Sequence, residues 1–196
     1  MNNRFNFRDT QLQGLRIIER KPMGDKRGYL ERLYSEDEFT KLLPREKITQ
    51  INQTRTNQRG TVRGMHFQYP PHSEIKIISC LEGEVFDVAV DLRSDSPTFL
   101  QWHCEILSSD IGKSLLVPEG FAHGFQTLSE NCKMLYFHTS NYNQAAEGGV
   151  LATDPKLKIE WPLPFTYISE RDMSYAPIDS NFRGIDKWNV DTAETN

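Results

Sequence analysis

The sequence lacks the features that mark several broad classes of protein. It has no basic tract with interleaved aromatic residues, and its formal net charge of -4 argues against nucleic-acid binding. No stretch approaches the ~20 consecutive apolar residues of a membrane span. The N-terminal residues 1–21 also lack the apolar stretch of a signal peptide. We therefore expect a soluble, cytoplasmic protein with no nucleic-acid or membrane partner.

Cysteine is scarce as well. The three cysteines, Cys80, Cys104 and Cys132, are far apart and odd in number, and no CxxC pair is present. This pattern predicts reduced, buried thiols rather than a disulfide framework. The chain of 196 residues is long enough to bury a core and suits a single domain. We expect one domain over residues 1–196, with its core over about 10–175 and a loop-rich C-terminal tail.

Short apolar segments punctuated by Gly, Pro, Asn and Asp make up most of the chain. Residues 84–92 alternate, so that Phe86, Val88 and Val90 face one way and Asp87 the other. Further short strands are expected at KIISCL, QWHCEIL, KSLLVP, GFQTL and KMLYFHT. Their spacing of roughly 8–12 residues is typical of a sandwich or barrel. The predicted fold class is all-β, a small antiparallel barrel or jelly roll.

One clear helix is expected, over residues 35–47. Ser35 can cap it, with Glu38 three residues later, and Phe39 and Leu43 belong to an apolar stripe. The predicted architecture is therefore a β-barrel with a short helix near its front.

Some polar residues within the predicted strands need an explanation, because side chains inside a barrel are shielded from water. His66 lies on a strand between Val62 and Phe67, where a packed core histidine is the simpler interpretation. Lys76 lies among isoleucines and either reaches solvent or points into a polar cavity. Asp87 has the same ambiguity, and alternation alone leaves both cases open.

Residues 118–125, PEGFAHGF, carry a more specific signal. A Pro-x-Gly turn followed by an inward-facing His123 is the second sequence motif of cupin barrels, and the glycine allows the tight turn. Metal-binding cupins add an earlier His-x-His and a Glu, whereas the earlier segment here, MHFQYP, has one histidine. Zinc, iron and manganese sites need three or four ligands. We therefore expect a cupin-type barrel without a metal, with His72, His103 and His138 as surface or packing residues.

A metal-free cavity lined by His, Lys, Asp, Arg and Tyr suits proton transfer on a small anionic ligand. Histidine is the side chain naturally poised near neutral pH, and a carboxylate such as Asp172 can orient it. Arg27 and Arg63 suit bidentate phosphate binding. Tyr136 is either a proton donor or a core aromatic residue.

Seven segments together resemble one cupin family, the deoxysugar-nucleotide epimerases typified by dTDP-4-dehydrorhamnose 3,5-epimerase. They are DKRGYLERLY, QINQTRTNQRGTVRGMHFQ, GEVFDVAVDLRSDSPTF, LLVPEGFAHGFQTLSE, LYFHTSNYNQAAEGG, DPKLKIEWPLP and ISERD. They follow the family order over roughly residues 10–175 and are highly specific as a set. The resemblance implies a cupin-type jelly-roll β-barrel, no cofactor, and a homodimer with exchange of N-terminal strands.

The resemblance also implies roles for individual residues. His66 would be the general base, and Asp172 would form its orienting dyad. Lys76 would stabilise the enolate oxygen, and Tyr136 would be the general acid on the opposite face. The residues implied to bind the sugar nucleotide are Arg27, Arg32, Gln50, Asn52, Arg63, His123, Tyr142, Glu147 and Arg171.

The implied reaction inverts C3 and C5 of dTDP-4-dehydro-6-deoxy-D-glucose to give dTDP-4-dehydro-L-rhamnose. Arg32 stands where the family often has Glu, and Phe137 where many members have Lys, which leaves the nucleotide base and the exact deoxysugar open. The alternatives are a mono-epimerase at C3 or C5, or an epimerase of another nucleotide sugar. Two further alternatives are a metal-dependent cupin oxygenase and a non-catalytic cupin that binds sugar nucleotides.

Overall fold

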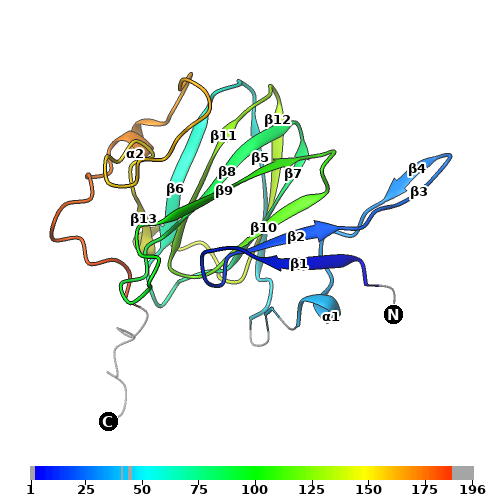
Figure 1. Cartoon of the computed structure of the whole chain (residues 1–196), viewed down its shortest axis with the longest axis horizontal. Coiled ribbons are helices and arrows are strands. Elements are labelled where there is room, and N and C mark those ends of the chain that lie inside the picture. Colours follow the sequence, from blue (N-terminus) through cyan, green and yellow to red (C-terminus); the bar gives the residue numbers. More distant parts are fainter. Residues whose placement is uncertain (1–2, 41, 44–45, 187–196) are drawn as a thin grey trace, which may run out of the picture.

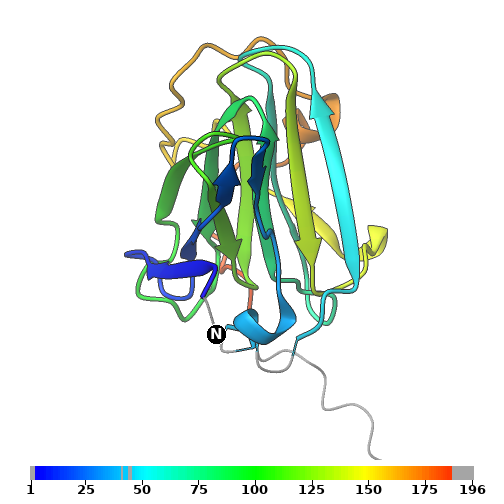
Figure 2. The same cartoon turned by 90° about the vertical axis from the view of Figure 1, so that its right-hand side faces the viewer.

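The computed structural model describes residues 3–40, 42–43 and 46–186, and most of its regular structure is β-sheet. A six-stranded antiparallel sheet contains β1 (Phe5–Asp9), β2 (Arg16–Arg20), β10 (Lys113–Val117), β7 (Lys76–Glu82), β12 (Cys132–His138) and β5 (Gln50–Thr56), in that order. A five-stranded sheet contains β13 (Glu147–Gly149), β6 (Val62–Gln68), β11 (Phe121–Thr127), β8 (Glu84–Asp91) and β9 (Trp102–Ser108). Figure 2 shows β5 and β12 running side by side. The predicted all-β, cupin-type jelly roll is confirmed.

The interior between the sheets is apolar at one end of the strands and polar at the other. The apolar part draws on both sheets, with Ile78, Leu115 and Met134 from the six-stranded sheet and Phe125 from the five-stranded one. Farther along the same faces of β7 and β12, the inward side chains are polar: Lys76 on β7, and Tyr136 and His138 on β12. The packed end therefore anchors the strands that carry the polar end.

The outer face of each sheet is covered by its own apolar cluster. The cluster outside the six-stranded sheet includes Phe5, Phe39 and Phe137. The cluster outside the five-stranded sheet packs Val88 and its neighbours against the segment 150–185. That segment has little regular structure besides α2 (Glu170–Met173). A short 3-10 helix, η1 (Gln144–Ala146), lies just before β13.

The helix predicted over residues 35–47 is much shorter in the structure, where α1 covers Glu36–Phe39. Ser35 precedes it, but its side chain makes no capping hydrogen bond. Glu38 instead accepts a hydrogen bond of 2.8 Å from the backbone N–H of Arg4, so the predicted capping box does not form. Part of the predicted span lies outside the described residues.

The hairpin of β3 (Met23–Asp25) and β4 (Gly28–Leu30) projects away from both sheets (Figure 1). Large apolar side chains on this hairpin, such as Tyr29 and Leu30, are exposed. Across the described ranges, no helix is long and apolar enough to cross a membrane. The predicted cytoplasmic location remains a prediction.

Candidate active site

Strand β6 directs two polar side chains into the space between the sheets. An irregularity in its pairing with β11 lets Arg63 and His66, three residues apart, both line that space. The irregularity occurs where the two backbones approach closely. A Cβ atom on Gly64, whose φ is +119°, would lie 2.6 Å from the Cα of Gly124. Glycine is therefore required at Gly64, which directly precedes the segment carrying His66.

His66 forms a hydrogen-bonded pair with Asp172. The His66 Nε2 atom lies 2.8 Å from Asp172 Oδ1, and the backbone N–H of Gly64 donates to Asp172 Oδ2 at 3.0 Å. Asp172 is placed by α2, where Ser169 accepts a capping hydrogen bond of 3.1 Å from the Asp172 backbone N–H. The motif Ser-Glu-Arg-Asp thus turns one carboxylate toward β6.

The electrostatics of the pair fix the direction of its hydrogen bond. Burial raises the pKa of Asp172, but the hydrogen bonds from His66 and Gly64 outweigh it and hold that pKa well below its usual range. Asp172 is therefore a carboxylate at neutral pH, and His66 donates Nε2–H to it. This tautomer leaves a lone pair on Nδ1 when the ring is neutral. Such a nitrogen can accept a proton from a ligand.

The six-stranded sheet forms the facing wall. Tyr136 on β12 and Lys76 on β7 both line the inner cavity. They share one face of the sheet, because Tyr136 pairs with Ile78 and Lys76 pairs with His138 in the antiparallel register. Burial raises the pKa of Tyr136 above its ordinary value, so the phenol keeps its proton at neutral pH. The Lys76 ammonium donates to the backbone carbonyl of His66 at 3.3 Å. The sequence left the direction of the Lys76 side chain open, and the structure shows that it points into the inner cavity.

A second histidine–carboxylate pair lies deeper. His123 Nε2 is within 3.0 Å of both carboxylate oxygens of Asp87, and both side chains are buried. The two residues sit two positions apart in the pairing of β8 with β11, on the same inner face. Asp87 therefore also points inward, and it gives the buried imidazole a counter-charge.

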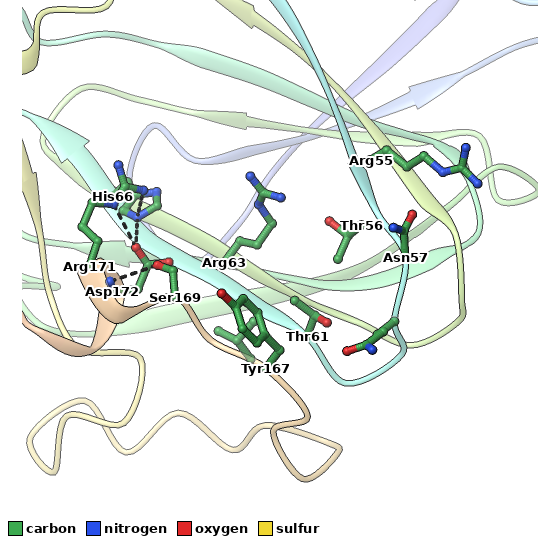
Figure 3. A pocket seen from close by; sticks show the side chains of 12 residues that line it. Arg55, Thr56, Asn57, Thr61, Arg63, His66, Tyr167, Ser169, Arg171 and Asp172 are labelled. Atoms are coloured by element: carbon green, nitrogen blue, oxygen red, sulfur yellow. Dashed lines mark hydrogen bonds and ion pairs between the residues drawn. The ribbon is translucent and has the colours of Figure 1, made fainter.

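Two connected cavities collect these side chains. The outer one has a volume of about 680 Å³ and includes Arg55, Tyr167 and Ser169 (Figure 3). The inner one has a volume of about 230 Å³ and lies between the two sheets. Both are lined by Arg63, His66 and Arg171, so these three residues lie where the cavities meet. The combined size falls in the range of small-molecule sites, roughly 300–1,000 Å³.

Most of the predicted binding residues meet at the inner cavity. Its lining includes Asn52, Arg63, His123, Tyr142, Glu147 and Arg171. Glu147 links two of them, since it accepts from Tyr142 Oη at 3.1 Å and from Arg171 Nη1 at 3.0 Å. Gln50 lies beside the cavity, where its side chain accepts from the Tyr142 backbone N–H at 3.0 Å.

Two predicted residues are not brought to either cavity within this chain. Arg27 lies on the projecting hairpin with 89% of its side chain exposed, and it pairs with Asp25. Arg32 pairs with Glu38 at 2.7 Å, beside α1. Both belong to the segment that leaves the barrel after β2, which explains their distance from the site.

The sequence interpretation missed two ionisable residues of the inner cavity, Glu74 and His138. His138 had been predicted as a surface or packing residue, and the structure corrects this. The signal was the period of two along a strand, because His138 lies two residues beyond Tyr136 and Glu74 two before Lys76. Either residue would share the inward face of its neighbour.

Comparison with known proteins decides the family. A family model described as dTDP-4-dehydrorhamnose 3,5-epimerase matches residues 9–180. The chain belongs to the dTDP-4-dehydrorhamnose 3,5-epimerase family. The enzyme of that name from Salmonella typhimurium is 42% identical over 154 residues, which cover 78% of this chain and 84% of the relative. The predicted family is thereby confirmed.

Solved structures agree with this assignment. The epimerase of this family from Legionella pneumophila, determined with dTDP-4-keto-L-rhamnose, is 39% identical with a TM-score of 0.82, covering 86% of this chain and 90% of the other. ChmJ, a 3'-monoepimerase from Streptomyces bikiniensis solved with dTDP-quinovose, is 27% identical with a TM-score of 0.80, covering 86% and 85%. Within the described part of the chain, no group of three or more His, Cys, Asp or Glu side chains is arranged to hold a metal ion.

Proposed function

We propose that this epimerase inverts C3 and C5 of dTDP-4-dehydro-6-deoxy-D-glucose, giving dTDP-4-dehydro-L-rhamnose. One observation carries the proposal. The His66 imidazole, the Lys76 ammonium and the Tyr136 phenol all line one cavity between the sheets, and Asp172 is bonded to His66 at 2.8 Å. A proton acceptor, a cation and a proton donor around one small space are the groups that such a reaction needs.

The chemistry follows from the ketone at C4. It makes the hydrogens at C3 and C5 acidic, and His66 Nδ1 removes one of them while Asp172 holds the ring. Negative charge moves to the C4 oxygen, where the Lys76 ammonium stabilises it. Tyr136 then returns a proton from the opposite face, which inverts the carbon. Each step moves a proton or a charge, so no cofactor is required.

The two cavities suit the two parts of a sugar nucleotide. We place the hexose in the inner cavity, beside His66 and Tyr136, and the nucleotide in the outer one. Arg63 and Arg171 lie at the junction, where a diphosphate would link the two parts, and guanidinium groups match phosphate geometry. The thymine base and the exact sugar are part of this proposal.

A mono-epimerase is the second candidate. It is favoured by the likeness to ChmJ, which shows that this fold also accommodates a 3'-monoepimerase. The test mixes EDTA-treated protein with dTDP-4-keto-6-deoxyglucose in D₂O and follows deuterium at C3 and C5 by NMR. Exchange at both carbons supports the double epimerase, and exchange at one supports the mono-epimerase. His66→Ala should abolish exchange, while His103→Ala, on β9 outside both cavities, should retain it.

We also propose a homodimer in which the β3–β4 hairpin contacts a second copy of the chain. The exposed Tyr29 and Leu30 side chains support this, because large apolar side chains gathered on a projecting hairpin gain stability when covered. The same contact would carry Arg27 toward the partner's cavity, giving that arginine the phosphate-binding role predicted from the sequence.

A further inference from the structure

A carboxylate and an imidazole beside Lys76 have no part in the scheme above. Glu74 Oε1 lies 3.3 Å from Lys76 Nζ, and Glu74 Oε2 lies 2.7 Å from His138 Nδ1. All three side chains are nearly buried, with exposed fractions of 11% for Lys76, 9% for Glu74 and 12% for His138. One carboxylate thus bridges the catalytic lysine and a second inner-face residue.

The backbone holds this bridge in place. Lys76 and His138 are direct partners across β7 and β12, so their side chains leave the sheet together. Just before β7, the backbone N–H of Ile75 donates to Thr139 Oγ1 at 2.8 Å, and the Thr139 N–H donates to the Ile75 carbonyl at 3.2 Å. These two bonds fix the segment that carries Glu74.

The imidazole of His138 has a defined orientation. Its Nδ1–H donates to Glu74, while the side-chain amide of Asn52 donates toward its Nε2 at 3.3 Å. A neutral ring satisfies both contacts, with a proton on Nδ1 and a lone pair on Nε2. The counter-charge of Glu74 is therefore the Lys76 ammonium, and His138 sets the carboxylate's position.

Glu74 is an anion despite its surroundings. Burial raises its pKa, but the hydrogen bond from His138 and the nearby Lys76 charge outweigh it and hold the pKa below the ordinary value. Lys76 shares the inner cavity with two guanidinium groups, Arg63 and Arg171. A carboxylate beside an ammonium offsets like charges nearby and removal from water, and only the charged form is a good partner for an oxyanion.

We propose that Glu74 is a positioning residue that keeps Lys76 protonated and directed at the substrate carbonyl, and that His138 orients Glu74 for this task. The inference rests on the proposed epimerase function. A lysine ammonium has three N–H donors. Glu74 and the His66 carbonyl take two of them, at 3.3 Å each, which leaves one for the C4 oxygen.

The decisive measurement is the pH dependence of kcat for Glu74→Gln, divided at each pH by that of the wild type. The division removes effects common to both enzymes, which arise from the other ionisable and charged groups in and beside the cavity: Arg63, His66, Asp87, Asp172, His123, Tyr136, Tyr142, Glu147 and Arg171. His138 contacts Glu74 directly, so its contribution is measured separately with the His138 variants. Without the negative charge of Glu74 the Lys76 ammonium shares the cavity with Arg63 and Arg171 uncompensated, and kcat should fall at least about tenfold at pH 8. The ratio should recover toward one as the pH falls to 6. A ratio that is constant with pH, or within twofold of one, would overturn the proposal.

Other variants separate positioning from bulk structural effects. Glu74→Asp keeps the charge and should restore a pH-independent ratio. His138→Asn keeps a donor near the Nδ1 position and should stay within about threefold of the wild type, whereas His138→Val should lose more. The matched control is Glu105→Gln, since Glu105 on β9 bridges Lys113 at 2.5 Å and His103 at 3.8 Å outside the cavities. It should leave kcat unchanged.

Each failure has its own signature. A wild-type protein that shows no exchange at C3 or C5 contradicts the proposed function itself. An active wild type with a flat Glu74→Gln ratio contradicts only the role of Glu74. If Glu74→Gln does not fold by circular dichroism, the two His138 variants decide, because equal activity of His138→Asn and His138→Val would refute the orienting contact.

Discussion

Asp172→Asn should show how much of the function of His66 depends on its orientation by Asp172, because His66 itself is unchanged in this variant. In the wild type Asp172 Oδ1 accepts from His66 Nε2 at 2.8 Å and from Arg171 Nε at 3.2 Å, while Oδ2 accepts from the Gly64 N–H at 3.0 Å. An asparagine has one oxygen and one NH₂ group in nearly the same volume. At least one of these donors must then face the NH₂ group, where it finds no acceptor.

Each orientation of the new amide has its own cost. If the amide oxygen keeps His66, the Gly64 N–H is buried and unpaired, which costs about 1–3 kcal/mol of stability. If the amide oxygen keeps Gly64, the NH₂ group requires a lone pair on His66 Nε2. The ring proton then moves to Nδ1, and Nδ1 can no longer accept a proton from the sugar.

The expected loss in kcat is about 10²–10⁴-fold, the usual contribution of a positioned acid or base. At 1.36 kcal/mol per factor of ten, this is about 2.7–5.5 kcal/mol in the barrier. The lowered pKa of Asp172 sets the pH window. A group whose folded pKa is depressed stabilises the fold above its unfolded value, about 3.9, and loses that contribution as the pH falls through the folded value. The stability difference between the wild type and Asp172→Asn should therefore be constant from pH 5 to 9.

The assay is deuterium exchange at C3 and C5 by NMR, with urea unfolding to measure stability. Asp154→Asn is the matched control. Asp154 is equally buried and accepts from the backbone N–H groups of Lys156 at 2.8 Å and Ile178 at 2.7 Å, away from the inner cavity. It should lose stability and keep its kcat. An Asp172→Asn enzyme within tenfold of wild-type kcat would refute the orienting role.

Three further predictions follow from other contacts. Tyr136→Phe should keep deuterium exchange through His66 but lower epimer formation about 100-fold or more, because the donor on the opposite face is lost; equal losses of both would contradict the assignment. Gly64→Ala should cost at least about 2 kcal/mol in urea unfolding, since its Cβ would lie 2.7 Å from the His123 carbonyl oxygen, and unchanged stability would contradict the close approach. Leu30→Asp should shift the protein from dimer to monomer in light scattering without changing the melting temperature of the barrel, whereas an unchanged dimer would refute the hairpin contact.

Local patterns predicted the strands well. Alternation along residues 84–92 and the short apolar segments that follow it match strands in the structure, because a period of two directly reflects which sheet face a residue occupies. The capping box of Ser35 and Glu38 failed because Glu38 accepts a hydrogen bond from the backbone N–H of the distant Arg4. Such a partner is brought close by folding and has no trace in neighbouring residues.

The site likewise combines residues that local patterns could place and residues that only folding brings together. His66 and Asp172, 106 residues apart, could be paired only through resemblance to a family, since no local pattern links β6 to α2. The inward direction of Lys76 depended on which face of β7 is covered by Phe39 and Phe137 and which faces the cavity. The period of two along a strand could have predicted that Glu74 and His138 face the cavity. Polar residues at the ends of strands are more often exposed, so their residue types did not indicate it.

The division of the barrel interior into an apolar end and a polar end has an evolutionary consequence. On β12, Met134 belongs to the packed end and His138 to the cavity, only four residues along the same strand. Substitutions at the polar end change the ligand or the chemistry, while the apolar end continues to supply the folding energy. Relatives can therefore change their substrate through residues on one stretch of each strand while the rest of the strand keeps the fold.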